Sequence, residues 1–167
     1  MFHTISDFLS AWKMESEATL KVFRALTDES LAQRVTPDGR SLGFIAWHII
    51  GSITYTMGEV GMAIAAASEK DPLPTSAAAI ADAFETCARL VAEAVPANWT
   101  DAQLGDHISI YGQSSWTKGM VLASLIEHSC HHRGQMTVLM RQAGLKVPGV
   151  YGPSREEWVN YGMDQQP

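Results

Sequence analysis

Apolar side chains recur at helical spacing along four long stretches of this chain, and this pattern limits the possible folds more than any other feature. The stretches cover residues 4–31, 42–68, 76–95 and 117–143. In the first stretch Lys, Glu and Arg fill the face opposite the apolar one, as in an amphipathic helix, and the fourth has a core-facing apolar stripe, while the third is rich in alanine. Four long helices with short connections predict an all-α fold, a four-helix bundle.

Turn and cap residues mark the ends of the expected helices. Ser41 is placed to cap the second helix, Pro96 is expected to end the third, and Gly144 follows the fourth, where a positive φ is favoured. Before the fourth helix, residues 107–111 are expected to be extended. A capping-box pattern near the C-terminus predicts a short extra helix over residues 154–161.

Length and composition indicate one globular domain, residues 1–167, with no linker or internal repeat. The chain is 46% hydrophobic and 18% charged, and it is long enough to fold without the help of a metal. Any metal site is therefore expected to serve function. A net charge of −6 disfavours nucleic acid and anionic lipid as partners and leaves a small-molecule substrate as the default.

The first residues lack the basic segment and apolar run of a signal peptide, and no apolar run reaches membrane-spanning length. The two cysteines, Cys87 and Cys130, suit a reducing compartment, although they could in principle form one bridge. We therefore expect a cytoplasmic protein. Both cysteines are interpreted as buried or partly buried free thiols.

Three of the six histidines carry the chemical information. On the fourth helix the core-facing stripe includes His132 and borders on His128, while His131 points away. Imidazoles four residues apart converge on one point, which is the geometry of helical metal sites, although such a pair alone is more often surface or hydrogen-bonded histidine. The other stripe members are Leu122, Leu125, Ile126, Ser129, Met136, Leu139 and Met140.

His48 strengthens the case because it lies within the apolar run 44–50 (FIAWHII), where a titratable ring needs a partner. A satisfied core histidine is the alternative for His48 alone. Bundles build metal sites from facing helices, so His48, His128 and His132 together predict a site for one divalent ion. Three neutral imidazoles suit Zn²⁺, Ni²⁺, Fe²⁺ or Co²⁺ and leave positions for water or substrate.

Other polar residues on these helices are candidates to orient the ligands or to contact substrate. Ser52 and Tyr55 share a helix face with His48, and Gln135 lies next to His128 on the fourth helix. Glu59 continues the same face but is interpreted as an ordinary polar position. The remaining histidines, His3 and His107, are expected at the surface. No catalytic acid or base is evident.

Three segments resemble the DinB-like (DinB/YfiT-like) superfamily of bacterial proteins: residues 39–48 (GRSLGFIAWH), 127–135 (EHSCHHRGQ) and 147–153 (VPGVYGP). The resemblance covers nearly the whole chain. It implies an up-down-down-up four-helix bundle, commonly a homodimer, with a metal bound by one histidine of the second helix and two of the last. By position these ligands are His48, His128 and His132.

The resemblance leaves the reaction open. Characterised relatives include enzymes that transfer bacillithiol or mycothiol to electrophiles and a mycothiol-dependent maleylpyruvate isomerase. It therefore implies a metal-dependent enzyme, with a low-molecular-weight thiol as cosubstrate in a thiol S-transferase. A metal-dependent hydrolase and a non-catalytic, stress-induced metal or ligand binder are the alternatives.

Overall fold

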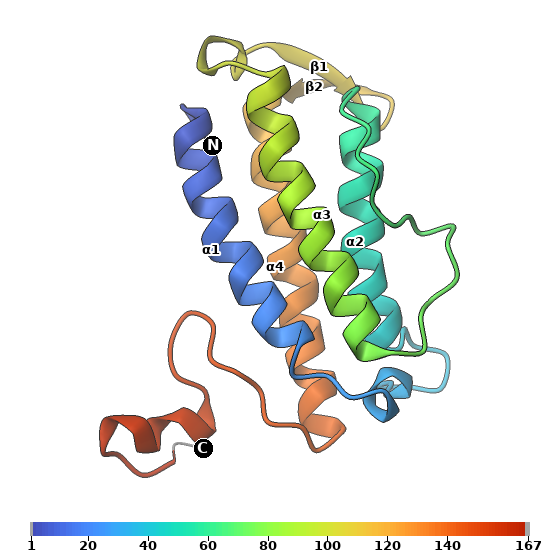
Figure 1. Cartoon of the computed structure of the whole chain (residues 1–167), viewed down its shortest axis with the longest axis vertical. Coiled ribbons are helices and arrows are strands. Elements are labelled where there is room, and N and C mark those ends of the chain that lie inside the picture. Colours follow the sequence, from blue (N-terminus) through green and yellow to red (C-terminus); the bar gives the residue numbers. More distant parts are fainter. Residues whose placement is uncertain (1, 166–167) are drawn as a thin grey trace.

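Four long helices form the bundle in the computed structural model, which describes residues 2–165 (Figure 1). Helices α2 and α3 run parallel to each other and antiparallel to α1 and α4, so the order along the chain is up-down-down-up. In the bundle α2 packs on α4 and α1 packs on α3. The four helices are α1 (Ile5–Phe23), α2 (Leu42–Glu59), α3 (Ala77–Asn98) and α4 (Lys118–Gln142).

Each long helix begins at a hydroxyl side chain that accepts a hydrogen bond from the backbone N–H three residues later. The four caps are Thr4, Ser41, Ser76 and Thr117. These bonds satisfy amides that have no partner within the helix. At the other end of α4, Gly144 has φ +75°, as expected for the residue after a helix.

Three helix ends differ from the sequence expectation. The first helix stops at Phe23, and a separate short helix, η1 (Glu29–Ala32), follows. The second stops at Glu59 rather than at residue 68, because Gly61 takes a positive φ of 78° that breaks the helical path. The third runs through Pro96 to Asn98, since a proline in the last turn removes a single backbone hydrogen bond.

A β-hairpin covers one end of the bundle, beyond the tops of α2 and α3 in Figure 1. The short helix η2 (Asp101–Gln103) leads into β1 (His107–Ile110), which pairs antiparallel with β2 (Gln113–Thr117). Tyr111 and Gly112 both have positive φ, as tight hairpin turns require. The extended segment was expected, but its partner strand was not.

The C-terminal segment leaves the bundle after α4 and ends in η3 (Arg155–Tyr161), which begins with the expected capping box. Ion pairs hold it against the bundle: Lys21 Nζ lies 3.4 Å from Glu157 Oε1, and Arg141 binds Glu156. The core between the helices is built from fully buried side chains that include Phe8, Phe84, Ile49 and Leu122. Within residues 2–165 no helix combines the length and the apolarity that crossing a membrane requires.

Candidate metal centre

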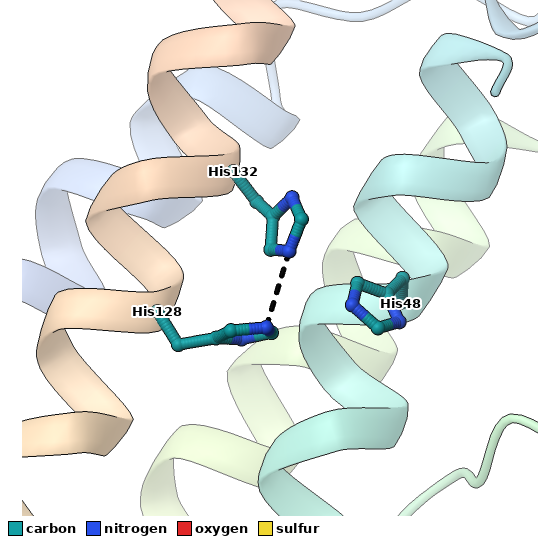
Figure 2. Close-up of side chains that lie close together, drawn as sticks. All are labelled: His48, His128 and His132. Atoms are coloured by element: carbon teal, nitrogen blue, oxygen red, sulfur yellow. Dashed lines mark hydrogen bonds between the residues drawn. The ribbon is translucent and has the colours of Figure 1, made fainter. Parts of the chain in front are cut away.

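His48, His128 and His132 meet between α2 and α4, and we call them the histidine trio (Figure 2). One ring nitrogen of each lies within 4.8 Å of those of the other two. The Nε2 atoms of His128 and His132 are 3.1 Å apart. Two ligands of a tetrahedral ion at 2.0–2.1 Å are separated by about 3.3 Å, so this pair already has the required spacing.

The Nδ1 atom of each trio residue contacts a neighbouring side chain. His48 Nδ1 binds the Glu69 carboxylate, and His128 Nδ1 lies 3.2 Å from Ser52 Oγ. His132 Nδ1 lies 2.8 Å from Gln135 Oε1. The Nε2 atoms therefore remain for a metal.

Hydrogen bonding assigns the proton of each ring to Nδ1. Glu69 and Gln135 Oε1 can only accept, and Ser52 Oγ already donates to the Ile49 carbonyl, so each receives an N–H from its histidine. A neutral imidazole with a proton on Nδ1 presents a lone pair on Nε2. The trio thus brings three ring nitrogens close together, and a cation bound between them would offset the repulsion of their lone pairs.

Burial favours the neutral form of His128 and His132. It lowers the pKa of His128 to about 4, with further lowering from His132 and His48, which disfavour a second charge nearby. Burial also lowers the pKa of His132. Near pH 7 neither ring carries the extra proton that an N–H···N bond across the 3.1 Å contact would need. The donor set therefore fits a divalent transition metal, which binds neutral imidazole.

Comparisons with known proteins agree with this fold. The DinB family model matches residues 1–166. The uncharacterized protein YrdA of Bacillus subtilis (strain 168) is 44% identical over 164 residues, which cover 98% of both chains.

This chain belongs to the DinB family.

Solved structures extend the comparison. A DinB-like protein from Bacillus cereus ATCC 10987 has a TM-score of 0.85 and 43% identity over 90% of this chain and 100% of its own. A second DinB-like protein, YjoA of Bacillus subtilis, has a TM-score of 0.65 at 16% identity over 86% of this chain and 97% of its own. The second likeness shows a shared fold alone.

Glu69 is a residue at the site that sequence analysis missed. It lies in the segment between α2 and α3, which the helical pattern placed inside the second helix up to residue 68. Gly51 lets this segment approach α2 closely, because a Cβ at residue 51 would come within 2.7 Å of the Glu69 backbone nitrogen. A carboxylate that holds the Nδ1 proton of a ligand histidine fixes its tautomer and ring orientation. A glycine one turn after His48 was the sequence signal for this close approach.

The other candidates on α2 and α4 divide into two groups. Ser52 and Gln135 contact the trio, although Gln135 binds His132 rather than the expected His128. Tyr55 does not contact the trio: it is 58% exposed, and its ring stacks on Tyr111 at a centroid distance of 6.0 Å. Glu59 Oε2 accepts from the Tyr111 backbone N–H at 3.4 Å.

The remaining histidines and cysteines are not members of the trio, although the His131 ring meets the His132 ring edge to face at a centroid distance of 4.8 Å. His131 is exposed, and its Nε2 accepts from Gln135 Nε2 at 3.1 Å. His3 and His107 are exposed, as expected. Cys87 is a buried free thiol whose pKa burial raises to about 12, so it is no nucleophile at neutral pH.

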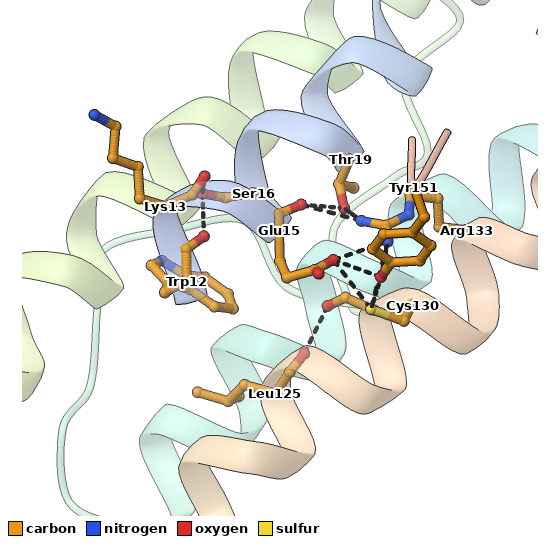
Figure 3. Close-up of polar contacts among 10 residues, drawn as sticks. Trp12, Lys13, Glu15, Ser16, Thr19, Leu125, Cys130, Arg133 and Tyr151 are labelled. Carbon is orange, nitrogen blue, oxygen red and sulfur yellow. Dashed lines mark hydrogen bonds and ion pairs between the residues drawn. The ribbon is translucent and has the colours of Figure 1, made fainter. Parts of the chain in front are cut away.

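A second polar cluster, also missed from the sequence, joins α4 to α1 and to the C-terminal segment (Figure 3). Arg133 is 3% exposed, and its guanidinium donates to Glu15 Oε2 at 2.8 Å and to Thr19 Oγ1 at 3.0 Å. Tyr151 Oη donates to the same Glu15 oxygen at 2.8 Å, and the Cys130 thiol lies 3.2 Å from it. We call these five residues the arginine cluster.

Proposed function

We propose that this DinB family member is a metal-dependent enzyme whose histidine trio holds one divalent transition-metal ion. The observation that supports this most is the convergence of three Nε2 lone pairs, each fixed by an Nδ1 hydrogen bond to Glu69, Ser52 or Gln135. Zn²⁺, Ni²⁺, Fe²⁺ and Co²⁺ all suit three imidazoles, and three protein ligands leave room for a substrate atom.

The reaction we propose is the transfer of a low-molecular-weight thiol to an electrophile. A divalent ion held by neutral ligands lowers the pKa of a thiol that binds it, so that thiolate exists near pH 7. In the transfer the sulfur forms a bond to an electrophilic carbon, that carbon releases its leaving group, and the thiol proton goes to solvent. No protein nucleophile is required, which agrees with the raised pKa values of Cys87 and Cys130, both due first to burial.

The chain's own residues would orient the site. Glu69, in the segment between α2 and α3, fixes the His48 ring, while Gln135 of α4 fixes His132 and Ser52 of α2 fixes His128. We propose that Tyr55 contacts the incoming thiol or electrophile at the outer rim of α2, where its ring is exposed.

Conjugation of thiols to monochlorobimane tests this function, because the sulfur displaces chloride and the product fluoresces. Metal-loaded protein should conjugate small thiols faster than metal-free protein or the His128→Ala variant. His131→Ala is the matched control and should keep the rate of the wild type. Tyr55→Phe should lower the rate and spare metal binding. Equal rates with and without metal would overturn the proposal.

Hydrolysis is the second candidate. It would need a general base for a water molecule. Glu69 is the carboxylate that the described structure places at the trio, and it is already bound to His48 Nδ1. Ester or amide hydrolysis without thiol dependence would favour this reading over transfer. Bound metal with neither activity would favour a non-catalytic, stress-induced binder.

We also propose a homodimer, as the family resemblance implies. In support, α1 and α3 line an open groove of about 430 Å³ with apolar side chains that include Leu9, Leu20 and Ala88. A second copy would bury this surface in a two-fold arrangement. Light scattering at micromolar concentration should give twice the chain mass of 18.2 kDa, and a mass near 18.2 kDa at every concentration would contradict the dimer.

A cytoplasmic location completes the proposal. Cys87 and Cys130 are both free thiols, which suits a reducing compartment.

A further inference from the structure

A cavity of about 170 Å³ lies directly beside the histidine trio, between α2 and α4 and against the hairpin. It shares His128 and Ser52 with the trio's surroundings, so a molecule inside it would contact a ligand residue of the proposed metal. Its polar and aromatic walls are Ser52 and Thr56 from α2, Ser124 and His128 from α4, and Tyr111 and Trp116 from the hairpin.

The hairpin places the aromatic side chain of Tyr111 against this cavity. Tyr111 has φ +54° and occupies the tight turn of the hairpin. Its Oη shares a 2.5 Å hydrogen bond with Thr56 Oγ1 across the cavity wall. Its ring meets Trp116 edge to face, with centroids 6.1 Å apart. These contacts fix Tyr111 over the cavity.

Size restricts the occupant. An apolar cavity of about 150 Å³ holds one benzene molecule, so this cavity has room for a single ring with a small substituent. A fused two-ring system would exceed this volume.

Charge and hydrogen bonding restrict the occupant further. None of the lining residues, all within the described part of the chain, is Asp, Glu, Lys or Arg. A charged molecule would lose its hydration without gaining an ion pair. The Ser124 hydroxyl donates to the Val121 carbonyl, so its oxygen remains as an acceptor for a ligand, whereas the Ser52 oxygen already accepts from His128 Nδ1 and donates to the Ile49 carbonyl. The matching ligand group is a hydroxyl or an N–H.

We propose that this cavity binds a small uncharged molecule with one aromatic ring and one hydroxyl or N–H donor, as the second substrate of the trio. The substrate role rests on the function proposed above. Binding itself does not, because the walls of the cavity form without metal.

Benzyl alcohol is the probe, and its binding to metal-free and metal-loaded wild type is measured by NMR titration. Both forms should bind it. Naphthalen-2-ylmethanol, which is too large, and benzyltrimethylammonium, which is charged, should each bind at least about tenfold more weakly. Failure of benzyl alcohol to bind either form, or equal binding of the three probes, would overturn the inference.

Variants locate the binding. Ser124→Leu fills the cavity and should weaken benzyl alcohol binding by about tenfold or more. Ser10→Leu is the matched control, since Ser10 also donates to a helix carbonyl but is exposed on α1. Should Ser124→Leu not fold, Tyr111→Asn removes the aromatic wall with a residue that tolerates positive φ, and it should also weaken binding. Tyr161→Asn, at an exposed tyrosine of η3, is its control.

Unchanged binding in a folded Ser124→Leu or Tyr111→Asn protein would contradict the inference. The two proposals fail in different ways. Protein that binds benzyl alcohol in the cavity but no metal would overturn the proposed function alone. Protein that binds metal and conjugates thiols but does not bind benzyl alcohol would overturn this inference alone.

Discussion

Helix α4 carries two polar clusters on neighbouring faces. They differ in whether their hydrogen-bond donors and acceptors all have partners. The arginine cluster is closed: the Arg133 guanidinium is paired with Glu15, and Glu15 also accepts from Tyr151. The histidine trio is open: every Nδ1 has a partner, while the three Nε2 lone pairs face one another. His132 and Arg133 are therefore neighbours in the sequence, but His132 belongs to the cluster with unpaired lone pairs and Arg133 to the cluster whose polar groups are paired.

A structural cluster and a functional one are distinguished by whether their polar groups satisfy one another. Polar groups that satisfy each other, as Arg133 and Glu15 do, join α4 to α1 and need no ligand. The lone pairs of the trio's ring nitrogens repel one another, and the fold holds them together in spite of this repulsion. Removing members of the first cluster should therefore change stability, and removing members of the second should change metal binding.

The largest effect is expected for stability when Arg133 is replaced. Arg133→Met leaves the Glu15 carboxylate, whose side chain is 16% exposed, without its cation. Breaking a fully buried pair costs roughly 3–5 kcal/mol of unfolding free energy, and this partly buried pair should cost up to about the lower end of that range. Urea unfolding measures it, and metal bound per folded chain should stay unchanged.

Arg89→Met is the matched control for this substitution. Arg89 pairs with Glu93 at 2.8 Å, but both side chains are 59% exposed, so the loss should stay below about 1 kcal/mol. Equal losses for the two arginines would mean that the arginine cluster does not stabilise the bundle.

The second-largest effect is expected for metal affinity, when His132→Ala is compared with His131→Ala. His132→Ala removes a ligand and should weaken binding more than the roughly 10- to 100-fold typical of residues that only orient a ligand. His131→Ala should leave affinity nearly unchanged, because this ring lies outside the trio. Competition with a fluorescent metal chelator measures both. Similar losses would show that the trio is not the binding site.

A smaller effect is expected from the carboxylate that orients His48. Glu69→Gln keeps the shape but weakens the hydrogen bond to Nδ1, so metal affinity should fall by roughly tenfold. Glu85→Gln, at an exposed glutamate that pairs with Arg24, is the control and should have no effect on affinity. Unaltered affinity in Glu69→Gln would show that the contact does not support the site.

The smallest effect is a pH dependence of stability that belongs to the arginine cluster. Burial alone would raise the pKa of Glu15, but hydrogen bonds from Arg133 and its neighbours hold it below the ordinary value. Its contribution to stability is therefore complete above the unfolded pKa of about 4.3 and is lost as pH falls through the lower folded pKa.

Comparison with a Glu15→Gln variant isolates this contribution. The difference in unfolding free energy between wild type and variant should shrink as pH falls below about 4. A difference that stays constant from neutral to acidic pH would contradict the proposed pairing.

Local rules were enough to predict most of the fold. Hydroxyl caps at Thr117 and Ser41 and the apolar stripe of α4 depend on neighbours within a turn or two, so the sequence displays them directly. The long helices, their order and the meeting of the trio followed from this pattern together with the family resemblance. Helix α2 was predicted too long because its apolar composition continues past Gly61, where the backbone turns.

Contacts between distant segments were not predictable in the same way. Glu69 reaches His48 through an irregular segment whose path depends on the space left by Gly51. The pairing of Arg133 with Glu15 joins residues 118 positions apart, and no periodic pattern reports it. The hairpin strand β2 was missed because its residues, QSSWT, lack the alternation of a half-buried strand.

The metal content of untagged protein decides whether the histidine trio is a metal site. After reconstitution with Zn²⁺ and removal of free ions by gel filtration, elemental analysis should find about one ion per wild-type chain. A folded triple variant, His48→Ala with His128→Ala and His132→Ala, should retain almost none. Wild type without metal, or a triple variant that keeps it, would contradict the claim that the trio is a metal site.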